Sequence, residues 1–196
     1  LSVNKNNGTA MGGATLTIDR FGQPNSAYLF NGSTQYISIA TNAGLPTGNS
    51  ARTICAWFRS TTPNPENIVS FGTMNTGNGN GLAKGGAAIL FYGFADDTVG
   101  NHNNLTSIWT HSCGTYNGTT TFLYMNGAQI GSMAKAWNTL AGAFNIGRRL
   151  DNVEFFTGSI DDVRIYNRVL SINEIRSLSG NHPMQASVWN TTPGTS

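Results

Sequence analysis

The sequence predicts an all-β fold, a sandwich or barrel of antiparallel strands, on three observations. Short runs of strand-forming residues follow one another along most of the chain. Asn-Gly or glycine-rich steps follow many of these runs, and such dipeptides tolerate the positive φ that hairpin turns require. Only one segment has a convincing helical pattern. Strands joined by tight turns are typical of β-sandwiches.

The strand-like runs alternate apolar and polar residues or are continuously apolar. The clearest hairpin joins 109–116 to 121–127 around the polar turn 117–120. Because Trp57 and Trp109 lie inside alternating runs, we expect both indoles in the core. The runs cover 27–32, 35–40, 52–59, 67–72, 87–94, 107–116, 120–127, 144–148 and 158–166.

One short helix is expected near the end of the domain. Ser171 precedes an Ile-Asn-Glu-Ile-Arg-Ser-Leu segment, and Glu174 three residues later completes a capping box. Ile172, Ile175 and Leu178 would share one apolar face. We therefore predict a short, peripheral helix.

Length predicts a single domain over residues 1–179, because 196 residues can bury one core and all-β domains of this size commonly stay undivided. Residues 180–196 are interpreted as a tail or linker. Segment 72–86 is so rich in Gly and Asn that we expect a long surface loop there.

Charge excludes some partners. Only 10% of residues are charged, the formal net charge is +2, and the eleven Lys and Arg form no basic stripe, so a nucleic-acid groove is not expected. No apolar stretch approaches the ~20 residues that span a bilayer. Solubility must come from neutral polar side chains.

The two cysteines lie in two strand-like runs. A bond between Cys55 and Cys113 would join two neighbouring strands of one sheet and indicate an oxidising, extracellular or cell-surface location. The alternative is a pair of buried, reduced thiols. Neither cysteine has the spacing of a zinc or redox motif.

The order of motifs resembles the laminin-G-like, concanavalin A-like jelly-roll superfamily over residues 15–178. That resemblance implies a two-sheet antiparallel jelly roll with one short C-terminal helix. The cysteine pair is similar to that of pentraxins, which implies an intrachain Cys55–Cys113 disulfide. Such folds usually have a strand before the Asp-Arg-Phe-Gly segment; few residues precede it here, so we expect a domain cut from a longer chain or a first strand supplied differently. The motifs lie at 18–32, 53–58, 109–118, 123–127, 145–148 and 156–175.

A structural calcium ion is also implied by the resemblance. Hard cations take six to eight oxygen ligands, which the rims of β-sandwiches supply from carboxylates and backbone carbonyls. Carried over to this chain, the ligands would be Asp19 or the Gly32 carbonyl, together with Asp161 or Asp162. The alternative is that Asp19 and Asp162 form ordinary ion pairs with Arg20 and Arg164.

Catalysis is not expected. Retaining glycan hydrolysis needs two carboxylates about 5 Å apart, usually two residues apart on one strand. The nine Asp and Glu include no such pair. Lyase chemistry would need His111, which is better explained as a strand histidine satisfied by a neighbour.

The leading functional hypothesis is a non-catalytic carbohydrate-binding or adhesion module that contacts a glycan or glycoprotein surface. Loop 148–157 combines cationic, acidic, amide and aromatic side chains, as sugar recognition requires. Trp137 and Tyr92 could add stacking surfaces. The alternative is a structural assembly domain of a fibre, shell or surface protein, packed against its own copies or neighbouring domains. The predicted ligand-binding residues are Arg148, Arg149, Asp151, Asn152, Phe155 and Trp137.

Overall fold

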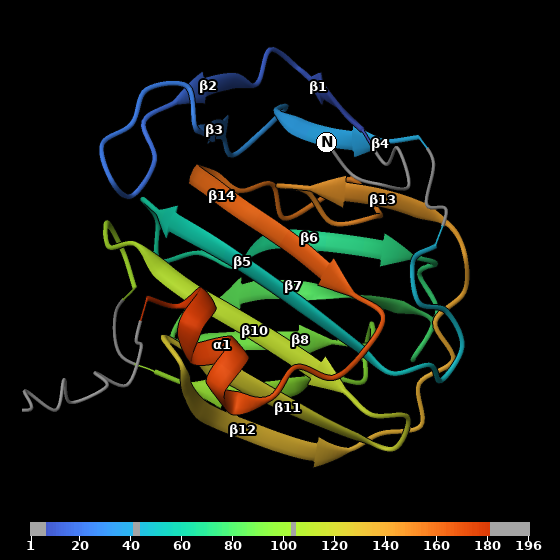
Figure 1. Ribbon diagram of the computed structural model, residues 1–196. Helices are drawn as coiled ribbons and strands as arrows, with labels where there is room; N and C mark the ends of the chain where they lie inside the picture. The colour runs from blue at the N-terminus through green and yellow to red at the C-terminus, as the bar shows by residue number, and fades with distance from the viewer. Residues whose placement is uncertain (1–6, 41–43, 103–104, 181–196) are drawn as a thin grey trace, which may run out of the picture.

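A computed structural model describes residues 7–40, 44–102 and 105–180, in which fourteen strands and one helix are found (Figure 1). The predicted tail lies outside the described residues beyond Gly180. The strands are β1 (Gly8–Met11), β2 (Thr15–Thr17), β3 (Ala27–Asn31), β4 (Tyr36–Ile39), β5 (Arg52–Ser60), β6 (Glu66–Gly72), β7 (Gly79–Gly85), β8 (Ala88–Tyr92), β9 (Thr98–Asn101), β10 (Thr110–Tyr116), β11 (Thr120–Met125), β12 (Ala128–Ala134), β13 (Ala143–Ile146) and β14 (Thr157–Tyr166), and the helix is α1 (Ile172–Leu178).

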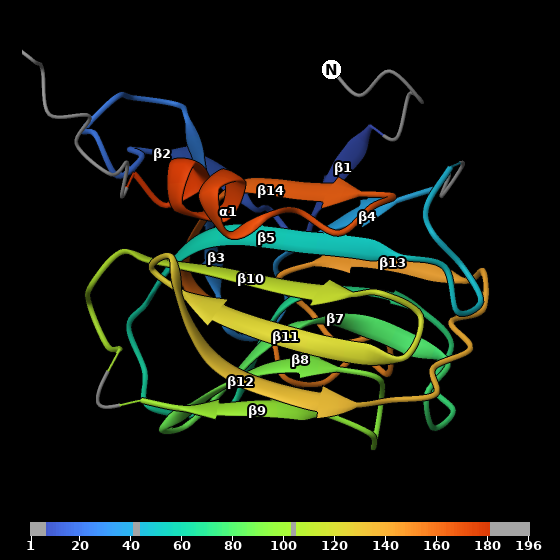
Figure 2. The ribbon, with the colours of Figure 1, turned by 60° about the horizontal axis from the view of Figure 1, so that its bottom comes forward.

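The strands form two antiparallel sheets of seven. Sheet A has the order β1-β4-β13-β6-β7-β8-β9, and sheet B has the order β12-β11-β10-β5-β14-β3-β2. The sheets lie face to face and meet along β9 and β12 (Figure 2). This confirms the predicted jelly-roll sandwich. Two strands, β1 and β2, precede the Asp-Arg-Phe-Gly turn, so a strand before this turn is present in the chain itself.

Alternation along β5 shows how the core forms. Ile54, Ala56 and Phe58 are fully buried in the apolar cluster between the sheets. Cys55 and Trp57 lie on the opposite, outer face, because successive strand residues point to opposite sides. The expectation that Trp57 is in the core is therefore wrong.

Trp57 and Trp109 are both half-buried. The Arg20 guanidinium lies 4.8 Å from the centroid of the Trp57 ring. Arg59 lies 5.5 Å from that of Trp109. Each indole is thus covered by a cation and not by core residues.

The disulfide and the helix form a second, smaller apolar cluster on the outer face of sheet B. Cys55 pairs with Cys113 across β5 and β10 and is bonded to it, which confirms the prediction. Helix α1 lies over this face (Figure 1), and Ile175 packs in the same cluster. The Ser171–Glu174 capping box is present as predicted.

Segment 72–86 is not a surface loop throughout, because residues 79–85 form β7 in the middle of sheet A. Glycine is required there by close packing. A Cβ at Gly81 would lie 1.9 Å from the Val69 carbonyl oxygen and 2.7 Å from the Tyr92 hydroxyl. The Asn80 side chain donates a hydrogen bond to the Tyr92 carbonyl, 2.8 Å away. The Gly and Asn residues that predicted a loop therefore allow β7 to pack closely against its neighbouring strands.

Within the described ranges, no helix is long and apolar enough to cross a membrane.

Candidate functional site

The candidate site is a pocket of about 500 Å³ on the outer face of sheet A. Strands β6, β7 and β8 form its floor, and the 93–97 and 148–157 loops form its walls. It contains amide, carboxylate, guanidinium and aromatic groups. The lining residues used below are Asn67, Tyr92, Phe94, Asp97, Arg149 and Glu154.

The pairing register of β6, β7 and β8 determines which side chains form the floor of the pocket. Asn67 of β6 pairs with Ala83 of β7, which pairs with Leu90 of β8, so the three side chains form one row across the sheet. Tyr92 lies two residues after Leu90, on the same face. Its buried hydroxyl donates to the Val69 carbonyl oxygen at 3.3 Å. The floor is therefore rigid and combines apolar and polar groups.

The 148–157 loop is held by ion pairs around Arg149. Its guanidinium donates two hydrogen bonds of 2.9 Å to the Asp151 carboxylate and a third to Glu154. The hydrogen bond from Arg149 lowers the pKa of the Asp151 carboxyl group, and the same bond raises the pKa of Arg149. A backbone bond from Asn67 to the Glu154 carbonyl, 2.9 Å long, fastens the loop to β6. Arg149 is thus fixed at the pocket wall.

Several polar atoms in the pocket have no hydrogen-bond partner among the described residues. Asn67 is fully buried, and its side-chain nitrogen and oxygen form no hydrogen bond of ordinary length and angle within the described residues. The Tyr92 hydroxyl lies next to it: burial raises the pKa of Tyr92, and the Asn67 side chain acts in the opposite direction. One oxygen of the Asp97 carboxylate is also unpartnered, and burial raises the pKa of this group. Each unsatisfied buried group costs about 1–3 kcal/mol. A bound water or ligand with its own donors and acceptors would remove that cost.

Backbone strain is concentrated around the same pocket. Phe94, Ala95, Asn152 and Glu154 have φ values of 46°, 58°, 66° and 49°. Non-glycine residues rarely adopt this left-handed conformation, which is enriched at binding sites. Both wall loops therefore have backbones that are unfavourable by themselves and are kept by the surrounding contacts.

The charges of the pocket are balanced. Lys84 and Arg149 lie at its wall, as do Asp97 and Glu154. Lys84 is buried, lies 3.7 Å from the Glu66 carboxylate, and donates to the Asn64 carbonyl at 2.8 Å. Because the charges of the wall compensate each other, the pocket suits a neutral polar ligand better than a polyanion.

The chain was compared with protein families, curated sequences and solved structures. A family described as the concanavalin A-like lectin/glucanases superfamily matches residues 31–176. The chain belongs to this superfamily. No curated protein sequence matches it.

Several solved structures share the fold of this concanavalin A-like domain. Domain 4 of AbnA, a GH43 extracellular arabinanase from Geobacillus stearothermophilus in complex with arabinotriose, matches with TM-score 0.68 and 19% identity, over 88% of this chain and 87% of that one. The binding domain of Paraclostridial Mosquitocidal Protein 1 matches with TM-score 0.69 and 19% identity, over 91% of this chain and 48% of that one. A heptameric SAP-like pentraxin from Limulus polyphemus matches with TM-score 0.55 and 19% identity, over 69% and 71%.

Within this concanavalin A-like domain, the residues predicted from loop 148–157 divide into three groups. Arg149 lines the pocket, whereas Asp151 and Asn152 are exposed on the loop. Arg148 and Phe155 instead pack on Tyr36 of β4. The Arg148 guanidinium lies 3.6 Å from the Tyr36 ring centroid, and the Phe155 ring centroid lies 6.4 Å from it.

Trp137 is not a stacking surface, which corrects the prediction. It is 1% exposed and packs on Phe91 and Tyr116, with ring centroids 5.0 and 5.2 Å away. Its indole nitrogen donates to the backbone and side chain of Asp96, both at 3.0 Å. Tyr92, the other expected stacking residue, is also buried. Trp137 is retained inside because its one polar atom is satisfied there.

No pattern in the sequence indicated Asn67 or Phe94 as binding residues. Asn67 lies in a strand, where outward polar side chains usually face water. Its role depends on the 148–157 loop covering it, and this contact joins residues far apart in the sequence.

The residues predicted for calcium have protein partners. Arg20 donates to Asp161 at 2.6 Å and to Asp162 at 2.9 Å, and Arg164 donates to Asp162 at 3.2 Å. An Asp19 oxygen accepts two backbone hydrogen bonds of 2.8 Å within its own turn. The backbone nitrogen of Gly32 donates to the Phe156 carbonyl. Asp162 therefore forms the ion pairs of the alternative, whereas Asp19 accepts backbone hydrogen bonds instead, and the calcium site stays a prediction.

Addition of a chelator tests that prediction. Because Arg20 already neutralises Asp161 and Asp162, we expect EDTA to leave the melting temperature unchanged in a thermal melt followed by circular dichroism. An ion that binds only the native state would stabilise it by RT ln(1 + c/Kd), where c is the free ion concentration, and a chelator would remove that stabilisation. A fall of several degrees that calcium reverses, and magnesium does not, would contradict our expectation and support the calcium site.

Proposed function

We propose that this chain is a non-catalytic, extracellular carbohydrate-binding module whose glycan site is the pocket between the 93–97 and 148–157 loops. The observation that carries the proposal is the buried Asn67 side chain, whose unpartnered donor and acceptor face a pocket with a half-buried aromatic ring at Phe94. Sugar hydroxyls both donate and accept, so they can satisfy an amide of this kind.

Three further observations support the proposal. Charge balance in the pocket favours a neutral sugar. A domain of the same fold is bound to arabinotriose in its solved structure, which suggests pentose oligosaccharides as probes. The Cys55–Cys113 disulfide supports an extracellular location.

The environments of the two pocket carboxylates, Asp97 and Glu154, favour binding without catalysis. Glu154 accepts a hydrogen bond from Arg149, so of the two carboxylates at the pocket wall only the half-buried Asp97 is not hydrogen-bonded to that guanidinium. Catalysis of glycan hydrolysis needs two available carboxyl groups on opposite sides of the scissile bond.

Two pocket variants test the proposal. Arg149→Ala should weaken binding of arabinotriose, or of whichever xylo-, cello- or galacto-oligosaccharide binds, at least tenfold, because a charge-assisted hydrogen bond contributes about 1.5–3 kcal/mol. Asn67→Leu should weaken binding similarly while leaving the melting temperature unchanged or higher, because it removes an unsatisfied buried amide. Isothermal titration calorimetry measures the first effect and thermal melting the second.

The matched control is Arg168→Ala. Arg168 also forms an ion pair, with Glu174, but lies beside α1 and not in the pocket. Its loss should not change glycan affinity. Equal affinity of the native chain and both pocket variants for the whole panel would contradict the proposed site.

An assembly domain is the alternative, and a specific surface favours it. Phe21 is 71% exposed, and Leu16, Ile18 and Leu29 are also exposed, on or near the edge strand β2. Exposed edge strands with apolar residues can pair with another chain. Light scattering distinguishes the two functions, since an assembly domain would be oligomeric without glycan.

A further inference from the structure

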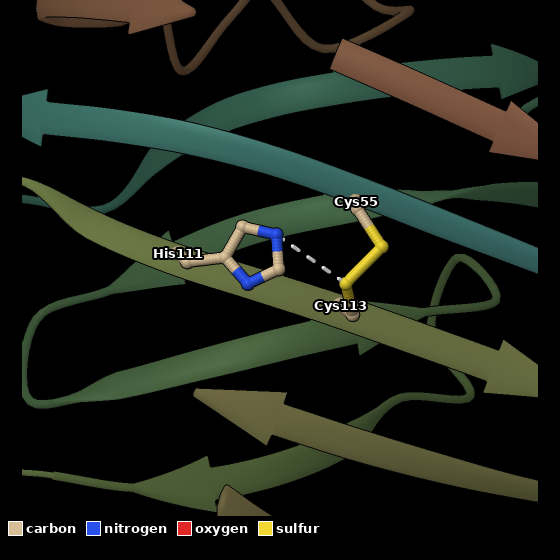
Figure 3. Close-up of side chains that lie close together, drawn as sticks. All are labelled: Cys55, His111 and Cys113. Carbon is tan, nitrogen blue, oxygen red and sulfur yellow. Dashed lines mark hydrogen bonds between the residues drawn. A yellow bond between two sulfur atoms is a disulfide. The ribbon is translucent and has the colours of Figure 1, made fainter. Parts of the chain in front are cut away.

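A histidine lies beside the disulfide on the outer face of sheet B. Cys55 and Cys113 are direct cross-strand partners on β5 and β10, with Cα atoms 4.1 Å apart. His111 precedes Cys113 by two residues on β10, so strand alternation places the two side chains on the same face. The His111 Nε2 atom lies 3.7 Å from the Cys113 sulfur (Figure 3).

The three side chains form a potential metal-ligand set. Their ligand atoms all lie within 4.8 Å of one another, and within the described part of the chain they are the one group of three or more His, Cys, Asp and Glu that meets this condition. Tetrahedral zinc with Zn–S of about 2.3 Å and Zn–N of about 2.0 Å separates neighbouring ligand atoms by about 3.5–3.8 Å. The observed nitrogen-to-sulfur distance already fits that geometry.

We propose that reduction of the Cys55–Cys113 disulfide converts this cluster into a zinc site. In the disulfide, both sulfurs are bonded to each other and carry no charge for a metal. A phosphine breaks the S–S bond and is oxidised to its phosphine oxide by water, whose two protons leave both sulfurs as thiols; a dithiol gives the same two thiols and is itself oxidised to a disulfide. Zinc then displaces the two thiol protons and binds both thiolates and the His111 imidazole, with a water as fourth ligand.

The surroundings suit such a site. All three residues are at most 2% exposed, and Leu170 and Ile175 cover the sulfurs, so competing water is limited. His111 also lines a second pocket, of about 240 Å³, beside the end of α1. That pocket opens beside the imidazole and is also lined by Arg20, Asp162 and Arg164, so the two arginines and one carboxylate are the charges that an approaching ion meets.

Apart from its contact with the Cys113 sulfur, the His111 ring makes no hydrogen bond within the described residues that zinc binding would break. Its Nδ1 atom has no partner within the described residues. Its backbone is fixed by hydrogen bonds with Asn126 in both directions, 2.9 and 2.8 Å long. Zinc would therefore bind a ring that β10 already orients. This inference is independent of the proposed glycan site.

The test uses the full chain reduced with a phosphine, with zinc as the probe. After dialysis, we expect one zinc per reduced chain and none per oxidised chain. Cobalt should give a thiolate-to-cobalt charge-transfer band in the reduced chain. His111→Gln should lower zinc affinity at least tenfold, and Cys55→Ala with Cys113→Ala should abolish binding, whereas the control His102→Gln should not change it.

Reduction can also unfold the chain, and this outcome remains informative. In that case zinc should restore the circular dichroism spectrum and raise the melting temperature. The proposal is overturned if the reduced chain retains no zinc, if zinc fails to restore an unfolded reduced chain, or if His111→Gln binds zinc as tightly as the native sequence.

Discussion

Replacement of both Cys55 and Cys113 with alanine is expected to lower the free energy of unfolding by about 4 kcal/mol. The disulfide joins residues separated by 58 positions, and the chain-entropy model assigns about 4 kcal/mol to a closed loop of this length. The bond also lies between the adjacent central strands β10 and β5 of sheet B. Urea denaturation, with EDTA present to exclude metal, measures the change.

A comparison with reduction makes this prediction specific. The native chain with a phosphine should denature at nearly the same urea concentration as the double alanine variant, and the variant should not respond to the phosphine. An unchanged midpoint for the native chain under complete reduction would show that the disulfide does not contribute to stability. Thiol labelling before and after unfolding establishes that reduction is complete.

The fold could be predicted because local pattern and tertiary structure agree in most elements. In β5, the alternation of Ile54 and Phe58 with Cys55 and Trp57 determines both the core face and the bonded face. The helix was predicted because its capping box uses only residues three apart. Both features depend on short-range chemistry, which a sequence displays directly.

The predictions that were wrong depend on contacts between residues far apart in the sequence. Strand β7 was taken for a loop because Gly81 is there to make room for Tyr92 and Val69, which lie on neighbouring strands. Trp137 was assigned to the surface because its partner Asp96 lies 41 positions away. Contacts between residues that are far apart in the sequence cannot be predicted from local composition or from the periodicity of apolar residues.

The candidate site was predicted in part for the same reason. Arg149 could be found because its loop is rich in binding groups over a short stretch. Asn67 and Asp97 could not, since only the register of β6, β7 and β8 and the covering loop bring them to one pocket. A buried asparagine without partners is recognisable as functional only once its surroundings are known.

Acidification from pH 6.5 to pH 4 is expected to lower the free energy of unfolding by about 3 kcal/mol through His111 alone. The pKa of His111 is lowered from 6.5 to about 4; burial is the largest cause, the charges of Arg20 and Arg164 act in the same direction, and Asp162 acts in the opposite direction. Between these pH values the unfolded chain binds a proton that the native chain does not. Stability is therefore complete above pH 6.5 and is lost as the pH falls towards 4.

A difference between two pH profiles isolates this effect from the other titrating groups. His111→Gln removes the imidazole, so its unfolding free energy, measured in urea with the disulfide intact, should fall less than that of the native chain between pH 6.5 and pH 4. Because His111 packs 5.2 Å from the Trp57 ring, the native chain should also show a change in tryptophan fluorescence as the imidazole becomes charged. Parallel profiles for the two chains would contradict a buried neutral histidine at this position. The proton must enter beside two arginines, Arg20 and Arg164, in a buried position where a third positive charge is poorly solvated.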